Sequence, residues 1–215
     1  MNSPIFLTFY SPTAMKKLYL TILAAFALLS CTDNRNDVLI IKGKVKDSML
    51  NGYPVYFRPQ PFPTDEIVLS STIKNGKFEF RIPADSLYVG DIVLTRSLDI
   101  QYEKLLIAVE PGVLNVNFGP VSSSGGTPLN DTLQCWKNYI TENVLSKMST
   151  EPALAQKNFN TRTTQLIKDH PDAFGGYIYF INAYSLSADQ IRELDSLGLN
   201  KLFPDVTKRQ IQYRR

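Results

Sequence analysis

Apolar and polar residues alternate with a period of two over residues 38–121, a pattern typical of half-buried β-strands. In the first segment one set of alternating residues is Leu39, Ile41, Gly43 and Val45. The other set is Ile40 followed by three lysines, Lys42, Lys44 and Lys46. Further strands are predicted around Val55 and Phe57 and over Asp91–Ser97, Glu103–Val109 and Val113–Phe118. About seven short strands with regular turn signals indicate an antiparallel β-sandwich.

The dipeptide Asn75-Gly76 lies between two of these alternating segments. It is favoured in two-residue type I′ turns, which connect neighbouring antiparallel strands. We therefore expect the two flanking segments to pair as a hairpin in a single register. The expected cross-strand pairs are Ile73 with Phe78, Ser71 with Phe80, and Leu69 with Ile82.

After the serine- and glycine-rich residues 122–126, the apolar period changes to three and four, which predicts helices. Thr127 can cap the first helix, with Pro128 at its first position. A second helix is expected over about Pro152–Lys168. A third runs from the cap Asp172 to Tyr184, and a fourth begins at a Ser187/Gln190 capping box and closes near Gly198. The sequence thus predicts an α+β protein with a β-sandwich at 38–121 and a helical segment of about four helices at 127–203.

The N-terminal region has the pattern of a bacterial lipoprotein signal. Met15-Lys16-Lys17 precedes an apolar run from Leu18 to Leu29, which is too short to span a membrane. The run ends in Leu28-Leu29-Ser30-Cys31, which resembles a lipobox. That resemblance implies cleavage after Ser30 and acylation of Cys31, which would anchor the protein to membrane lipid.

This interpretation divides the chain into a signal peptide at 1–30, a tether at 31–37, the two folded parts, and a basic tail at 204–215. Residues 1–14 are expected to be an over-extended start. The full chain has 23 basic and 20 acidic residues, but residues 1–30 contribute two lysines and no acid. The mature chain is therefore nearly neutral, with 21 basic and 20 acidic residues. Such a balance gives no reason to expect nucleic-acid binding.

Few residues offer reactive chemistry. The chain has one histidine, two cysteines and no Cys-x-x-Cys sequence, so it lacks the ligands of a four-thiolate zinc site. We expect His170 to interact with helix-terminal carbonyls and Cys135 to pack as a small helical residue. These observations predict a protein that is not an enzyme and has no catalytic residue, metal or cofactor.

Aromatic residues cluster near a proline-rich stretch. Tyr53, Tyr56, Phe57 and Phe62 can form a ligand patch for a sugar or peptide. Packing in the core and at the edge of a sandwich explains the same residues, and we favour that explanation.

Several motifs, taken in order, resemble a known family. They are the segment ending at Cys31, the turn regions 75–80 and 110–112, the Gly-Thr-Pro-Leu-Asn-Asp segment 126–131, and His170-Pro171-Asp172. Their order resembles a domain of unknown function found at the N-terminus of many bacterial envelope lipoproteins, before a thioredoxin-like domain. The resemblance covers about Val38 to Phe203.

The resemblance does not extend to redox chemistry. In that family a thioredoxin-like domain with a Cys-x-x-Cys pair usually follows the helical segment. Dithiol exchange needs an attacking and a resolving thiol, and this chain has no such pair. Either the chain is a stand-alone version, or it is truncated before a thioredoxin-like domain.

Together these observations predict a lipid-anchored protein of the bacterial cell envelope, in the outer rather than the inner membrane. We expect a non-catalytic binding or positioning module, with a further envelope protein as a candidate partner. One alternative is an N-terminal remnant or accessory part of a membrane-anchored thiol–disulfide oxidoreductase. Another is a glycan-binding envelope lipoprotein.

Overall fold

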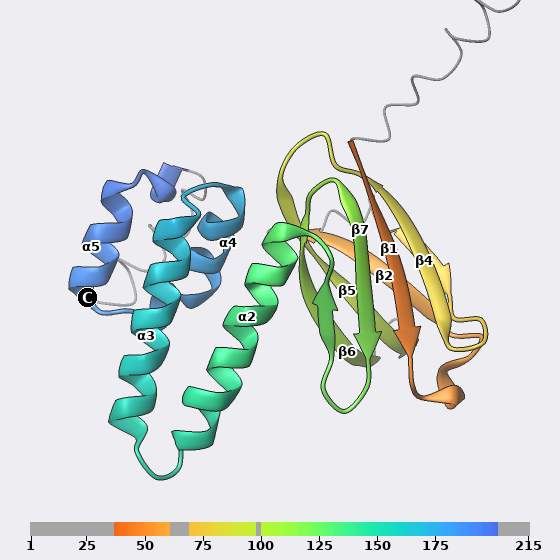
Figure 1. Cartoon of the computed structure of the whole chain (residues 1–215), viewed down its shortest axis with the longest axis horizontal. Helices are drawn as coiled ribbons and strands as arrows, with labels where there is room; N and C mark the ends of the chain where they lie inside the picture. The colour runs from red at the N-terminus through yellow and green to blue at the C-terminus, as the bar shows by residue number, and fades with distance from the viewer. Residues whose placement is uncertain (1–36, 61–68, 98–99, 202–215) are drawn as a thin grey trace, which may run out of the picture. The chain divides into compact units, whose positions relative to one another are not determined.

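The computed structural model describes residues 37–60, 69–97 and 100–201, which form a β-sandwich followed by helices (Figure 1). Sheet A has the strand order β4-β1-β7-β8, and sheet B has the order β3-β2-β5-β6. This arrangement confirms the predicted α+β class. The strands are β1 (Val38–Val45), β2 (Pro54–Gln60), β3 (Leu69–Thr72), β4 (Lys77–Pro83), β5 (Tyr88–Ser97), β6 (Ile100–Val109), β7 (Gly112–Phe118) and β8 (Ser123–Gly125).

The alternating residues bury the face that the pattern predicts. Leu39 and Ile41 of β1 are fully buried, as are Leu114 and Val116 of β7, and together they form part of the core between the sheets. The opposite face of the same strands carries lysines and asparagines together with Ile40 and Val113. Because successive side chains in a strand point to opposite faces, one strand supplies both a core surface and a solvent surface.

Two features of the sandwich differ from the prediction. Strand β8 lies in the serine- and glycine-rich segment that we interpreted as a break, because a three-residue strand has no apolar alternation to reveal it. In addition, β1 pairs with β7 in parallel, with Ile41 opposite Leu114. Alternation indicates which face a strand buries, but it carries no information about the direction of its neighbour.

The turn at Asn75-Gly76 is confirmed. Both residues have positive φ, 52° and 68°, as a type I′ turn requires. The backbone groups of Lys74 and Lys77 exchange hydrogen bonds of 2.8 and 3.0 Å across it. This pair is the only rung that directly connects the two flanking segments in the described residues.

The predicted hairpin register is wrong, because the two flanking strands enter different sheets. Strand β3 pairs with β2, and β4 pairs with β1. Phe80 therefore lies opposite Ile41 rather than Ser71, and Ile82 lies opposite Leu39. The local pattern placed Phe78, Phe80 and Ile82 on a buried face correctly. Pairing β4 with β1 leaves that face unchanged, so the pattern does not distinguish the two arrangements.

The described helices begin and end close to the predicted positions. Thr127 occupies the N-cap position of α2, but its side chain makes no capping hydrogen bond. Asp172 accepts hydrogen bonds from two backbone N–H groups of α4, and the Ser187/Gln190 capping box is present at α5. The α-helices are α2 (Pro128–Asn143), α3 (Pro152–Asp169), α4 (Ala173–Asn182) and α5 (Ala188–Ser196). Short 3₁₀ turns cover Ser48–Leu50, Leu145–Lys147, Ala183–Ser185 and Leu199–Lys201.

Helix α2 packs against one edge strand of each sheet, β8 of sheet A and β6 of sheet B (Figure 1). Its Asn130 side chain accepts a hydrogen bond from Ala108 N and donates one to Ala108 O on the edge strand β6, at 3.0 and 2.8 Å. Further along the helix, Gln134 accepts a bond from Ser124 N of the edge strand β8. Unpaired edge groups are therefore satisfied by helix side chains.

The helices cover sheet B and leave the outer face of sheet A exposed. Val89 and Ala108 of sheet B are buried in a second core, which also contains Phe174 and Ile178 of α4. On the outer face of sheet A, by contrast, the residues of β1, β4 and β7 are exposed or half-buried. A ligand therefore has access to an open sheet surface on sheet A.

Candidate functional site

The outer face of sheet A presents polar residues in rows that the strand register defines. One row contains Asn117 of β7, Lys44 of β1 and Lys77 of β4, which lie directly opposite one another. The next row, two residues along each strand, contains Asn115, Lys42 and Glu79. All six side chains are exposed.

Lys44 and Lys77 are like charges on opposite residues of neighbouring strands. Such a pair is destabilising, whereas opposite charges in the same place would be favourable. In the second row Glu79 lies opposite Lys42, but its carboxylate contacts Arg81 at 4.0 Å. Within the described residues, none of Lys42, Lys44 and Lys77 forms an ion pair, and no carboxylate lies opposite Lys44.

A groove with a volume of about 830 Å³ passes over these rows. It extends from sheet A across the edge strand β4 to β3, the edge strand of sheet B. We call it the lysine groove and define it by its lining. The lining consists of Lys42, Gly43, Lys44, Ser70, Ser71, Thr72, Lys74, Lys77, Phe78, Glu79, Asn115 and Asn117.

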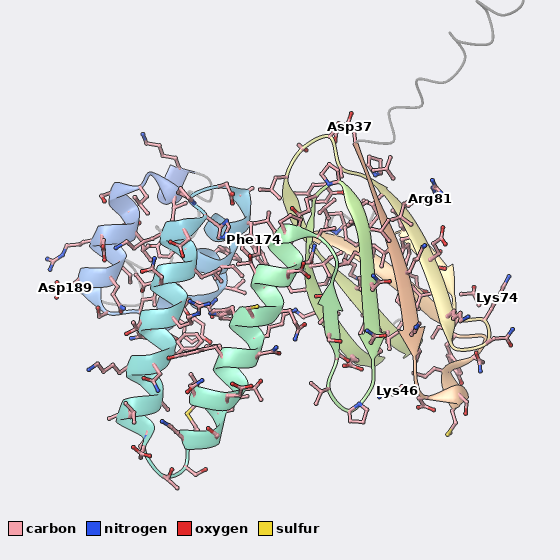
Figure 2. All side chains as sticks on the ribbon, viewed as in Figure 1. Asp37, Lys46, Lys74, Arg81, Phe174 and Asp189 are labelled. Carbon is pink, nitrogen blue, oxygen red and sulfur yellow. The ribbon has the colours of Figure 1, made fainter. Side chains whose placement is uncertain are left out.

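A second hollow of about 270 Å³ adjoins the lysine groove. The two share Lys44, Lys77 and Asn117, and the second adds Lys46. Figure 2 shows Lys46 and Lys74 toward the end of sheet A that lies away from Asp37. Five lysines thus gather at one end of the sheet.

The type I′ turn positions two of these lysines. Lys74 and Lys77 are held on either side of the turn by their mutual backbone bonds. Gly76 N donates to the Asn51 side chain at 2.8 Å, and Val45 N donates to Gly76 O, also at 2.8 Å. These hydrogen bonds attach the turn to β1 and to the segment before β2. They therefore fix the backbone that carries Lys74 and Lys77.

The lining of the lysine groove offers charge and hydrogen bonds to a ligand. Lysine ammonium groups supply positive charge, and the Asn, Ser and Thr side chains both donate and accept hydrogen bonds. The groove contains one carboxylate, Glu79, and no histidine or cysteine. The arrangement favours a hydrophilic anion.

The structure divides the predicted aromatic patch. Phe57 is 1% exposed and belongs to the core between the sheets, so it is not part of a surface patch. Tyr56 is half-buried and, being the preceding residue in β2, points to the opposite face. Tyr53 is 37% exposed. Phe62 lies outside the described residues.

The two cysteines have different outcomes. Cys31, the predicted lipidation site, lies outside the described residues. Cys135 is exposed on α2, so the expectation that it packs as a buried small residue is wrong. The side chains of α2 that pack against the protein are its neighbours. Leu133 is fully buried, and Trp136 donates a hydrogen bond to Thr163 of α3.

His170 lies at the end of α3, as predicted. It is the C-cap residue, and its backbone N–H donates to Ile167 O at 3.3 Å. Its ring packs edge-on against Phe174, with 5.6 Å between ring centroids. Its described contacts are those of a residue that joins α3 to α4.

A buried charged cluster lies where the helices meet sheet B. Asp91 of β5 is 2% exposed; its carboxylate accepts a hydrogen bond from Gln60 at 2.8 Å and lies 3.5 Å from Lys104 Nζ. Lys137 of α2 donates to Leu106 O at 2.9 Å. Burial lowers the pKa of Lys137 to about 8, while nearby Asp91 opposes the shift.

Tyr177 of α4 completes this cluster. Burial, and secondarily the Asp91 charge, raises the pKa of Tyr177 to about 12. Perturbed pKa values often mark functional sites, but structural ion-pair networks perturb them too. Here the groups link α2 and α4 to sheet B, so we assign the cluster a structural role. Among the described residues, no group of three or more potential metal ligands occurs.

Sequence reasoning missed the lysine groove, although a signal was present. The signal consists of the alternating lysines of the first strand and the two lysines that flank Asn75-Gly76. Two separate segments meet at Lys44 and Lys77 because β4 pairs with β1. Had that pairing been inferred, the cluster would have been predictable.

Comparisons with known proteins add a family match and no more. Neither the curated proteins nor the solved structures compared with this chain include a match. No helix among the described residues has the length and apolar character of a membrane span. Residues 39–133, which include every residue of the lysine groove, match a family described as Domain of unknown function (DUF4369).

Proposed function

We propose that this protein is a lipid-anchored module of the bacterial cell envelope that binds an anionic ligand in the lysine groove without catalysing a reaction. The lipobox-like sequence at Cys31 supports the anchor and the envelope location, with the outer membrane as the expected site. The open face of sheet A supports the binding role. Further support is that the groove offers charge and hydrogen-bonding groups without a reactive constellation.

The observation that carries the binding role is the Lys44–Lys77 pair. Edge strands often carry lysines that prevent edge-to-edge association, and this could explain Lys77 on β4. It does not explain Lys42 and Lys44, because β1 has a neighbour on both sides. Lys44 lies on a central strand opposite another lysine, which costs stability, and a bound anion would remove that cost.

Binding of a general polyanion tests this function. The full chain, purified in a neutral detergent, is titrated with fluorescent dextran sulfate at low and moderate salt. The K44Q/K77Q double variant should weaken binding by at least about tenfold, with a salt dependence shallower by about two charges. The matched control K157Q/K201Q removes two exposed lysines of the helical segment. Equal weakening by both double variants, or no binding by the wild type, would overturn the proposal.

The anchor has its own test. Substitution of Cys31 by Ser should leave an unprocessed precursor that no longer incorporates labelled fatty acid. The Cys135→Ser variant retains the predicted lipidation site and is the control. Unchanged fatty-acid incorporation in the Cys31 variant would contradict the proposed anchor.

One observation favours the alternative, an accessory part of a thiol–disulfide oxidoreductase. The exposed thiol of Cys135 is accessible to a partner's disulfide. Exchange would form a mixed disulfide between Cys135 and the partner and release the partner's second sulfur as a thiol. Trapping a Cys135-dependent mixed disulfide with an envelope protein that contains a Cys-x-x-Cys pair would support this function.

A further inference from the structure

We infer that the ligand of the lysine groove is an acidic polysaccharide, with one carboxylate or phosphate held between Lys44 and Lys77. This inference rests on the proposed anion-binding function and specifies its ligand class. It follows from the arrangement of charge, the hydrogen-bonding groups beside it and the shape of the groove.

The arrangement of charge favours a ligand with spaced anionic groups. Neighbouring strands lie about 4.8 Å apart, and residues two apart in a strand lie about 6.6 Å apart. Lys44 and Lys77 are therefore close enough to share one anion, whereas Lys42 stands one row away from Lys44. Glu79 beside Lys42 makes that second row nearly neutral. The groove thus has one strongly positive row, Lys44 with Lys77, next to a row in which Lys42 and Glu79 have opposite charges. This arrangement suits a polymer whose anionic groups are separated by uncharged ones.

The uncharged lining favours hydroxyl groups between those charges. Asn117 shares the row of Lys44 and Lys77, and Asn115 shares the row of Lys42. The Asn117 side chain makes no hydrogen bond within the described residues and is exposed to a ligand. Amides and hydroxyls both donate and accept, as sugar hydroxyls do. Ser70 and Thr72 continue this polar lining onto β3.

The same lining disfavours two other polyanions. A membrane surface is flat, and interfacial sites present exposed aromatic or aliphatic side chains to it. The apolar side chain of the groove lining, Phe78, is only 6% exposed. Single-stranded nucleic acids bind on exposed aromatic platforms on which bases stack, and the lining offers none.

The position of the groove also disfavours the anchoring membrane. The predicted lipid attachment precedes β1, whereas Lys44 is the seventh residue of that strand. At about 3.3 Å per residue, Lys44 lies about 20 Å along the strand from Val38. Figure 2 shows Asp37 at one end of sheet A and Lys46 toward the other. The groove is thus set back from the point where the tether joins the sheet.

Four probes separate the ligand classes. The full chain in neutral detergent is titrated with polygalacturonate, neutral dextran, polyglutamate and vesicles containing phosphatidylglycerol. We expect polygalacturonate to bind at least about tenfold more tightly than polyglutamate, and dextran to bind negligibly. Polyglutamate supplies carboxylates without sugar hydroxyls, so the first ratio reports hydroxyl recognition.

Two variants assign the interactions to residues. K44Q/K77Q should weaken polygalacturonate and polyglutamate alike, because it removes the charge. Asn117→Ala should weaken polygalacturonate by about fivefold or more while leaving polyglutamate within about twofold. Asn138→Ala, an exposed asparagine of α2, is the control and should change neither.

The outcomes distinguish this inference from the proposed function. If polyglutamate or the vesicles bind as tightly as polygalacturonate, or if Asn117→Ala has no selective effect, the polysaccharide inference is wrong and anion binding stands. If no polyanion binds, or if K44Q/K77Q behaves like K157Q/K201Q, both are wrong.

Discussion

At the scale of single residues, the most demanding position is Asn130. Its side chain is completely buried and makes three hydrogen bonds, two to the backbone of Ala108 and one to the Thr127 hydroxyl. The amide thereby takes the place of a neighbouring strand at the β6 edge. Few other side chains both donate and accept in this geometry.

Replacing Asn130 by Ala should lower the free energy of unfolding by about 3 kcal/mol, because it leaves a buried N–H and C=O without partners. Urea denaturation measures the change. The control is Asn138→Ala on the same helix, which should cost no more than about 0.5 kcal/mol. A similar cost for both variants would show that the edge bonds contribute little.

Lys77 is the opposite case, a residue retained at a cost to stability. Lys77→Glu places a carboxylate opposite Lys44 and should raise the free energy of unfolding by about 0.2–1 kcal/mol. The same variant should lose affinity for dextran sulfate. Lys157→Glu introduces the same charge change on an exposed part of α3 and should do neither. A less stable Lys77→Glu protein would contradict the like-charge argument.

At the scale of elements, the contact of β1 with β4 depends on a glycine. Phe78 of β4 lies across Gly43 of β1, so that a Cβ at position 43 would lie 2.0 Å from a Phe78 ring atom. The ring also packs against Phe80 and Phe118, with centroids 5.7 and 6.1 Å away. It therefore has little freedom to move aside.

Gly43→Ala should destabilise the protein by about 1–3 kcal/mol through overpacking. In a Phe78→Leu background the same substitution should cost clearly less, because the smaller side chain leaves room for the methyl group. A double-mutant cycle in urea measures this coupling. Additive effects of the two substitutions would contradict a direct clash between the residues.

At the scale of the whole molecule, the two faces of the sandwich have different roles. Sheet B is covered by helices and contains the buried cluster around Asp91, whereas sheet A carries the exposed lysine groove. The helices and the ligand surface therefore do not compete for one face. The burial of Lys137 and Tyr177 where α2 and α4 meet sheet B should make the stability of the protein depend on pH.

Lys137 and Tyr177 predict opposite slopes of stability with pH. Because the pKa of Lys137 falls to about 8, the unfolded chain holds the proton that the folded chain has lost between about pH 8 and 10.5. Stability should therefore rise with pH in that window. Because the pKa of Tyr177 rises to about 12, the unfolded chain loses its proton first between about pH 10 and 12. There stability should fall.

Denaturation of the wild type and of two variants at several pH values isolates these slopes. Relative to the wild type, Lys137→Gln should lack the increase in stability above about pH 8, and Tyr177→Phe should lack the decrease above about pH 10. Gln keeps the first two methylene groups of the Lys137 stem, and Phe keeps the ring of Tyr177. If stability depends on pH in the same way for all three proteins, the pKa of neither group differs between the folded and unfolded states.

Local patterns in the sequence determined most of the elements. Alternation predicted the buried faces of β1 and β7, Asn75-Gly76 predicted a type I′ turn, and the helix caps at Thr127, Asp172 and Ser187 lie where expected. These features depend on residues close together in the chain. Propensity, capping and side-chain period therefore suffice to specify them.

Only the tertiary structure decided which strands are neighbours. The turn and the alternation predicted one hairpin register, but β3 and β4 belong to different sheets. Strand β1 pairs with β7 in parallel. Either arrangement buries Phe78, Phe80 and Ile82, so their burial does not select one. The lysine groove shares this origin, because Lys44 and Lys77 meet only through the pairing of β1 with β4. Alternation specifies the face of each strand, whereas the packing of the whole sandwich specifies its neighbours.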